Sequence, residues 1–182
     1  MHERRFNRQI ERLRDPERVA KLEVKLVVDF SLKGLKHHTD MLDVGTGSGL
    51  FAEEFACRGL NVTGLDANPE MLPFARQFVP SGTFQEGAAE ALPFPDGSFD
   101  LIFMGLLLHE TDDPAAAIAE ANRVTRQRLA VLEWPDEDQE FGPPRADRLA
   151  ATKIMTFASE AGFPVVRSIR LMNLSLFLMD LG

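Results

Sequence analysis

Apolar positions along the chain alternate between two spacings. Short continuous apolar runs at residues 41–44 and 129–133 are typical of buried strands, whereas apolar residues three and four positions apart are typical of helices. The first such helix has Asp15 at its cap, Pro16 at its first turn and Gly34 at its end. Val19, Leu22, Leu26, Val27 and Phe30 would recur on one face of this helix.

The same two spacings predict the remaining elements. Further strands are expected at 61–65, 83–85, 99–104, 165–171 and 175–179, and further helices at 50–58, from Asn68 and Pro69, at 113–125 and at 145–161. Strands alternating with helices imply an α/β fold with a doubly wound, mostly parallel sheet. The linker 172–174 is too short for a parallel crossover, so the last two strands must be antiparallel.

Length and composition restrict the class of protein. A chain of 182 residues fits a single domain, and its net charge of −8 argues against nucleic acid as a partner, since phosphate binding needs a basic face. The charged N-terminus and the lack of any run near the roughly 20 apolar residues of a membrane span favour a cytoplasmic protein with no membrane partner. Cys57 is the only cysteine and no residues have metal-ligand spacing, so no metal is expected.

A glycine-rich turn after the first strand carries the candidate chemistry. Ligands of open parallel sheets bind beyond the carboxyl ends of the strands. Gly45, Gly47 and Gly49 allow a tight turn that brings the backbone close to a ligand, and Asp43 can hold this loop or accept hydrogen bonds. Asp66 closes the second strand, where two carboxylate oxygens can accept hydrogen bonds from both hydroxyls of an adenosine ribose.

Two classes of cofactor share this geometry. A dinucleotide site prefers Gly-x-Gly-x-x-Gly, which would place its third glycine where the chain has Leu50. Here the third glycine comes one position earlier, and Ala67 after Asp66 offers no arginine for a 2′-phosphate. A nicotinamide-dependent oxidoreductase is therefore the weaker reading.

Five segments give the sequence a family resemblance. It resembles the small class I S-adenosylmethionine-dependent methyltransferases of the quinone-biosynthesis-like group, methyltransferase type 11. The resemblance runs from about Asp40 to Phe163, and its most specific stretch is Leu-Pro-Phe-Pro-Asp-Gly-Ser-Phe-Asp. It implies a Rossmann-like seven-stranded sheet with an antiparallel last strand, S-adenosylmethionine as cofactor and a small-molecule acceptor. The segments that carry it are 41–49, 64–72, 90–100, 106–109 and 119–124.

The resemblance also implies which residues contact the cofactor. Gly45 and Gly47 would contact its methionine part, Asp66 its ribose, and Ala67 with Met71 its adenine. Leu106 would face the cofactor at the end of the fourth strand. The remaining positions of the implied cofactor site are Asp43, Thr46, Gly49, Ala88 and Ala89.

Two departures from the family pattern stand out. Many relatives read Gly-Asp-Ala after the third strand, with the aspartate on the adenine amino group, but here the stretch is Gly87-Ala88-Ala89. That side-chain contact is lost, and only backbone groups of Ala88 and Ala89 remain for it. The usual Pro-Gly-Gly turn before the fifth strand is replaced by residues 126–128, away from the cofactor.

Methyl transfer asks little of the side chains. A sulfonium is already activated, so in-line orientation of the acceptor supplies most of the rate, and a base is needed only for a protonated acceptor. His109, with Glu110 beside it, is the best base candidate, and Glu133 is the second; for both, lining of the pocket is the alternative role. A non-catalytic module that binds S-adenosylmethionine stays open as a second hypothesis, because of Ala88 and the altered turn at 126–128.

Two regions are expected to close the site within the single domain 1–182. They are an N-terminal helical cap, 1–38, and an acidic, proline-flanked substrate loop, 135–144. Trp134, Phe141 and Glu133 are expected to contact the acceptor. Removal of residues 136–141 is expected to abolish turnover and to leave cofactor affinity nearly intact. A cap this small leaves open a homodimer in which a second subunit helps to hold the acceptor.

Overall fold

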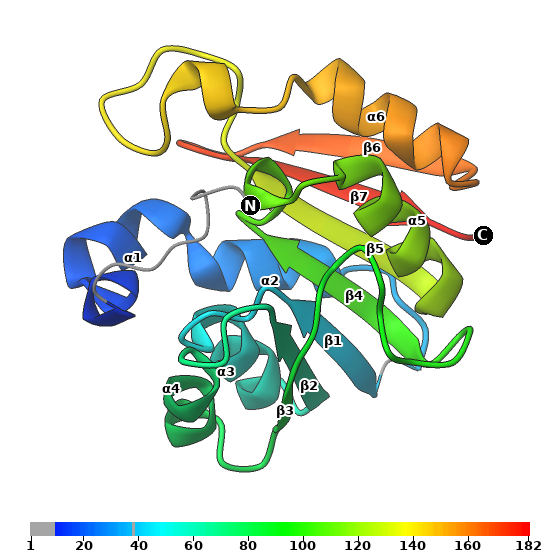
Figure 1. Ribbon diagram of the computed structural model, residues 1–182. Helices are drawn as coiled ribbons and strands as arrows, with labels where there is room; N and C mark the ends of the chain where they lie inside the picture. The colour runs from blue at the N-terminus through cyan, green and yellow to red at the C-terminus, as the bar shows by residue number, and fades with distance from the viewer. Residues whose placement is uncertain (1–9, 38) are drawn as a thin grey trace.

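A single seven-stranded sheet organises the computed structural model, which describes residues 10–37 and 39–182 (Figure 1). The strand order is β3-β2-β1-β4-β5-β7-β6. Strands β1 to β5 are paired in parallel, and β7 runs antiparallel to both of its neighbours, β5 and β6. The predicted doubly wound sheet with an antiparallel last strand is thus confirmed. The strands are β1 (Asp40–Val44), β2 (Asn61–Asp66), β3 (Thr83–Glu86), β4 (Phe99–Gly105), β5 (Thr125–Glu133), β6 (Val165–Arg170) and β7 (Ser175–Asp180).

Helices cover both faces of the sheet and divide its core into two layers (Figure 1). Side chains of α2, α3 and α4 join one apolar cluster, and those of α5 and α6 join the other. Central strands β1 and β4 are buried on both faces for this reason and read as continuous apolar runs. The helices are α1 (Pro16–Leu22), α2 (Val24–Leu32), α3 (Leu50–Cys57), α4 (Leu72–Phe78), α5 (Pro114–Val124) and α6 (Ala151–Glu160), with 3-10 turns η1 (Ile10–Arg14), η2 (Leu108–Glu110) and η3 (Arg145–Asp147).

The strand order reverses between β1 and β4. The chain leaves β1 toward β2 on one side, while β4 pairs with β1 on the other. A crevice opens at such a switch point, outside the carboxyl ends of the strands, because the helices that follow pack on opposite faces. The N-terminal segment, blue in Figure 1, lies at the end of the sheet to which the arrowhead of β4 points.

The predicted first helix is divided in two. Glu23, between α1 and α2, adopts a left-handed conformation with φ 49° and breaks the helical path. The hairpin between β6 and β7 accounts for the break. Its Met172 N–H donates to the Glu23 carboxylate at 2.9 Å, and its Asn173 amide donates to the Lys21 carbonyl at 3.2 Å.

Two predicted boundaries were also wrong. The helix expected at 145–161 begins only at Ala151, because the side chain of Arg148 turns under the preceding loop and bonds its carbonyls. Strand β5 begins at Thr125, four residues earlier than predicted, so residues 126–128 are strand and not a turn. Arg126 bonds Asp100 and Arg128 bonds Asp180, which hold the early part of β5 in the sheet.

The described helices are too short or too polar to cross a bilayer.

Candidate functional site

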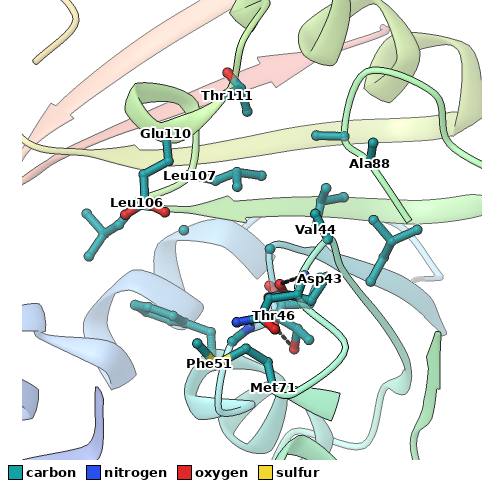
Figure 2. A pocket seen from close by; sticks show the side chains of 18 of the residues that line it. Asp43, Val44, Thr46, Phe51, Met71, Ala88, Leu106, Leu107, Glu110 and Thr111 are labelled. Atoms are coloured by element: carbon teal, nitrogen blue, oxygen red, sulfur yellow. Dashed lines mark hydrogen bonds between the residues drawn. The ribbon is translucent and has the colours of Figure 1, made fainter. Parts of the chain in front are cut away.

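A cavity of about 840 Å³ lies outside the carboxyl ends of β1, β2 and β4. Volumes of about 300–1,000 Å³ are typical of small-molecule sites. Four parts of the chain line it: the N-terminal segment, the glycine loop after β1, the end of β2 with the segment after β3, and the turn after β4. Figure 2 shows Ala88, Leu107, Glu110 and Thr111 on one side and Asp43, Thr46, Phe51 and Met71 on the other.

The glycine loop brings backbone to the cavity surface. Gly45 has φ +71°, and a Cβ there would lie 2.7 Å from Leu107 Cδ1, so only glycine fits. A Cβ on Gly47 would meet no atom closer than Leu13 Cδ1, at 3.5 Å, so this residue leaves the loop open toward the cavity. The N–H groups of Gly45 and Thr46 both donate to the Leu65 carbonyl, which ties the loop to the end of β2.

Gly49 serves packing in this structure. It is the N-cap of α3 with φ +74°, and a Cβ there would lie 3.0 Å from Ala75 Cα in α4. Among the described residues it is the one member of the predicted cofactor set that does not line the cavity. Its lack of a side chain lets α3 and α4 approach each other below the loop.

Asp43 is a buried carboxyl at the end of β1. Its side chain accepts a hydrogen bond from Thr46 Oγ1 at 2.8 Å, and its residue is 2% exposed. Burial raises the pKa of Asp43 to about 7; the Thr46 and Ala52 hydrogen bonds lower it, and the charge of Asp66 raises it further. The loop is therefore anchored by a group that changes charge near neutral pH.

Asp66 braces the glycine loop from the neighbouring strand. Its Oδ2 accepts from the Gly47 N–H and its Oδ1 from the Asn68 N–H, both at 2.8 Å. Asp66 also lines the cavity, so the carboxylate that braces the loop borders the space that a ligand would occupy.

His109 and Glu133 form a buried pair behind the cavity wall. His109 Nδ1 lies 2.9 Å from Glu133 Oε2, and the side chains of His109 and Glu133 are 8% and 1% exposed. Burial alone would lower the pKa of His109. The hydrogen bond and charge of Glu133, with the charges of Glu110 and Asp147, outweigh burial and raise it. Glu110, the next residue after His109, does line the cavity. Its carboxylate lies 3.8 Å from His109 Nε2 and points into the cavity in Figure 2.

Comparison with known proteins decides what kind of site this is. Residues 42–129 match the family model of a methyltransferase domain. This part of the chain is similar to a methyltransferase domain. The matched segment contains the glycine loop, Asp66 and Glu110, so it covers most of the cavity wall.

Named relatives share this methyltransferase core. A demethylmenaquinone methyltransferase from Renibacterium salmoninarum is 38% identical over 107 residues, which are 58% of this chain and 44% of that protein. A malonyl-[acyl-carrier protein] O-methyltransferase from Serratia marcescens is 41% identical over 92 residues, which are 50% of this chain and 36% of that protein. The chain thus spans less than half the length of these curated relatives.

A solved structure has the same fold over almost the whole chain. The crystal structure of an S-adenosylmethionine-dependent methyltransferase from Aquifex aeolicus superposes with a TM-score of 0.78. It is 24% identical and covers 95% of this chain and 97% of its own. The methyltransferase fold therefore includes the N-terminal helices and the final hairpin, beyond the segment matched by the family model.

The other predicted cofactor residues also line the cavity wall. Ala67 and Met71 follow β2, and Ala88 and Ala89 follow β3. Leu106, directly after β4, has φ +58° and donates its N–H to the Leu132 carbonyl at 2.7 Å. A left-handed conformation is costly for a leucine, and such strain is concentrated at functional sites.

Trp134 and Phe141 do not lie where they were expected. Within the described residues neither side chain lines the cavity. Their rings pack against each other with centroids 5.9 Å apart, and Trp134 belongs to the apolar cluster that contains Leu22. Leu22 of the same cluster does line the cavity, so the two aromatic residues belong to the apolar core that continues into its wall.

The sequence predicts an N-terminal cap but does not indicate which of its residues line the cavity. Arg14 donates twice to the Ser48 carbonyl, forms an ion pair with Glu53 at 2.6 Å and stacks 3.4 Å from the centroid of the Phe78 ring. These contacts fasten η1 to the glycine loop, and they bring Leu13, Arg18 and Leu22 into the cavity wall. The arginine-rich composition of this segment was the available signal, but it does not reveal which arginine docks.

The raised pKa of Asp43 predicts that ligand affinity depends on pH. If its ionised form binds the ammonium group of S-adenosylhomocysteine, affinity should rise about tenfold between pH 6 and pH 8, through a pKa of about 7. The stability of the free protein changes with pH in the opposite direction, because a raised pKa means that stability is lost as pH rises through that value. Calorimetry at several pH values on wild type and Asp43→Asn measures the effect.

The Asn variant serves as the control for that titration. The hydrogen bond and charge of Glu133 raise the pKa of His109, and any slope that persists in Asp43→Asn belongs to another group such as this one. A wild-type affinity that does not change with pH would remove Asp43 from the ligand contacts.

Proposed function

We propose that this chain binds S-adenosylmethionine and transfers its methyl group to a small organic acceptor. The observation that carries the proposal is the juxtaposition of the glycine loop and Asp66 at the mouth of one cavity. The similarity of residues 42–129 to a methyltransferase domain supports it. The curated relatives match only the core of this chain, and the proposal extends to the whole protein.

The residues present fit this cofactor. Gly47 exposes backbone where a side chain would fill the cavity, and Asp66 brings to the cavity a carboxylate, a group that binds ribose hydroxyls as an acceptor. Met71 is buried beside Ala67 and offers an apolar surface for the adenine. Asp43 is a natural partner for the ammonium group, either directly or through Thr46.

The chain's own residues would bind, orient and shield the reactants. When bound, S-adenosylmethionine supplies a methyl group that is already activated for in-line displacement. The apolar side chains Leu13, Leu22 and Phe51 exclude water from one side of the cavity, which strengthens electrostatic interactions inside it. Orientation of the acceptor nucleophile within about 3–3.5 Å of the methyl carbon is then the main source of rate.

Glu110 replaces His109 as our candidate for contact with the acceptor. Glu110 lines the cavity, whereas His109 and Glu133 lie behind it. In our proposal the Glu110 carboxylate accepts a hydrogen bond from the N–H or O–H of the acceptor. The His109–Glu133 pair then acts as a positioning group, because its imidazole holds Glu110 from behind at 3.8 Å.

The two alternatives have weaker support. A nicotinamide cofactor would require a third glycine where α3 begins with Leu50, and that side chain also lines the cavity. A non-catalytic binding module rests on Ala88 and the altered stretch 126–128; the position of Ala88 in the wall leaves its backbone available to the adenine, and residues 126–128 belong to β5. Cytoplasmic location, a small molecule rather than nucleic acid as the partner, and a homodimer stay predictions; size-exclusion chromatography with light scattering tests the last.

Thermal unfolding with candidate ligands tests the proposed function. At 100 times its dissociation constant a ligand stabilises the folded state by about 2.7 kcal/mol, or roughly 5–10 °C in a domain of this size. S-adenosylmethionine and S-adenosylhomocysteine should produce this shift, and NAD should not. A shift with NAD alone would support the oxidoreductase instead.

Turnover separates the enzyme from a binding module. Protein incubated with S-adenosylmethionine radiolabelled on its methyl group should label a fraction of small-molecule extract and leave macromolecular extract unlabelled. Glu110→Gln should lower that labelling while the thermal shift persists. Cofactor binding without labelling of either extract would favour the non-catalytic module.

A further inference from the structure

Arg18 occupies an unusual place for an arginine of a surface helix. It lies in α1 and lines the cavity, as do the apolar residues Leu13 and Leu22. Its Nε atom is shielded from solvent and has no hydrogen-bond partner within residues 10–37 and 39–182. Burial lowers the pKa of Arg18, and the charge of Glu110 across the cavity opposes that effect.

A buried donor without an acceptor destabilises a folded protein, and the great majority of buried polar groups are paired. An arginine of a short surface helix could instead extend into solvent and keep its charge hydrated. The placement of this guanidinium inside a cavity therefore points to a ligand group that completes its hydrogen bonds.

The geometry of the guanidinium selects the ligand chemistry. Its planar fork of N–H donors matches the two oxygens of a carboxylate. Leu13 lies 3.5 Å from the position of a Cβ on Gly47, so the N-terminal segment and the glycine loop flank the same part of the cavity. Within the proposed function, on which this inference rests, both the methionine end of the cofactor and an acidic acceptor can supply a carboxylate there.

We propose that Arg18 binds a carboxylate inside the cavity, from the cofactor or from the acceptor. Arg18 is then the cationic partner that this predominantly acidic cavity needs for a ligand with a negatively charged end. The carboxylates that line the cavity are Asp43, Asp66, Glu90, Glu110, Asp112 and Asp113.

Calorimetry with two nucleosides locates the carboxylate. S-adenosylhomocysteine carries the amino-acid end, and 5′-methylthioadenosine lacks it. If the cofactor supplies the group, Arg18→Met should bind S-adenosylhomocysteine about 10–100 times more weakly and 5′-methylthioadenosine as wild type does. Arg18→Lys should bind S-adenosylhomocysteine with an affinity between those of wild type and Arg18→Met. Arg12 is an exposed arginine of the preceding turn, and Arg12→Met should bind both nucleosides as wild type does.

A second arm detects a carboxylate from the acceptor. Benzoate and acetate are titrated against the protein with and without S-adenosylhomocysteine, and the Arg18 Nε–H resonance is followed by NMR. If the acceptor supplies the group, both nucleosides bind Arg18→Met normally, and the carboxylates shift this resonance in wild type. Equal weakening of both nucleosides, or no response to any carboxylate in either arm, would overturn the proposal.

Stability gives a readout that a structural arginine would not share. Arg18→Met keeps the apolar stem and removes the unpaired donor, so the free protein should unfold at an equal or higher denaturant concentration. A structural role would lower that midpoint. Wild type that fails to bind S-adenosylhomocysteine would refute the proposed function, and the benzoate and acetate titrations without nucleoside would still decide the role of Arg18.

Discussion

Asp66→Ala should weaken the binding of S-adenosylhomocysteine by about 10²–10⁴-fold. Each hydrogen bond between the carboxylate and a ribose hydroxyl is worth about 1.5–3 kcal/mol, and each 1.4 kcal/mol is a factor of ten in affinity. The carboxylate is already oriented by the Gly47 and Asn68 N–H groups, so little ordering is needed when the ligand binds. Isothermal calorimetry measures the effect.

Glu86→Ala is the matched control for that experiment. Glu86 pairs in register with Asp66 at the end of the neighbouring strand, but it is exposed and does not line the cavity. Its removal should change affinity less than twofold. A similar loss in both variants would mean that negative charge in general, and not the Asp66 contact, favours the ligand.

The loss in Asp66→Ala could also come from a disturbed glycine loop, because Asp66 braces Gly47. A ligand analogue separates the two causes. Wild type should bind the 2′-deoxyribose analogue of S-adenosylhomocysteine more weakly than the parent, whereas Asp66→Ala should bind both equally. If the variant still discriminates between them, the ribose hydroxyl is held by another group.

The cofactor side of the site could be predicted because its signals are local. The glycine turn follows a strand directly, and Asp66 ends the next strand, so sheet geometry alone brings them together. Gly49 was included by the same spacing, but its contact with Ala75 in α4 depends on how two helices pack. Spacing alone does not distinguish a glycine required by a ligand from one required by a neighbouring helix.

The acceptor side could not be predicted in the same way. The short turn η2 places Leu108 in the core, His109 toward Glu133 and Glu110 toward the cavity. Three consecutive residues thus face three directions, and no periodicity reveals which of them faces a ligand. Arg14 and Arg18 likewise gain their roles from contacts with distant segments of the chain.

A buried arginine organises the proline-flanked loop 135–144. Arg148 is 8% exposed, and its guanidinium bonds five oxygen atoms of this loop at 2.8–3.1 Å. These bonds also explain why the helix expected from residue 145 begins later. The acceptors are the carbonyls of Pro135, Glu137, Phe141 and Pro143 and the side-chain amide oxygen of Gln139.

Arg148→Ala should lower the free energy of unfolding by about 3–5 kcal/mol. Its removal leaves several carbonyls without their donor, and breaking a buried hydrogen-bond network is among the most destabilising single changes. Urea denaturation measures the loss. Arg145→Ala is the control, since Arg145 is half exposed and bonds Asp136 and Asp138 of the same loop only at the surface. Its effect should stay within about 0.5 kcal/mol.

The same variant separates the support of the cavity from the binding of the cofactor. Trp134 and Phe141 belong to the same apolar cluster as Leu22, so a loosened loop should disturb the N-terminal wall and leave the glycine loop intact. At a temperature where Arg148→Ala is still folded, we expect affinity for S-adenosylhomocysteine within about threefold of wild type and lower methyl transfer. An equal loss of both would mean that the loop supports the whole cavity. Unchanged stability would show that water replaces the guanidinium at little cost, and that the prolines alone hold the loop.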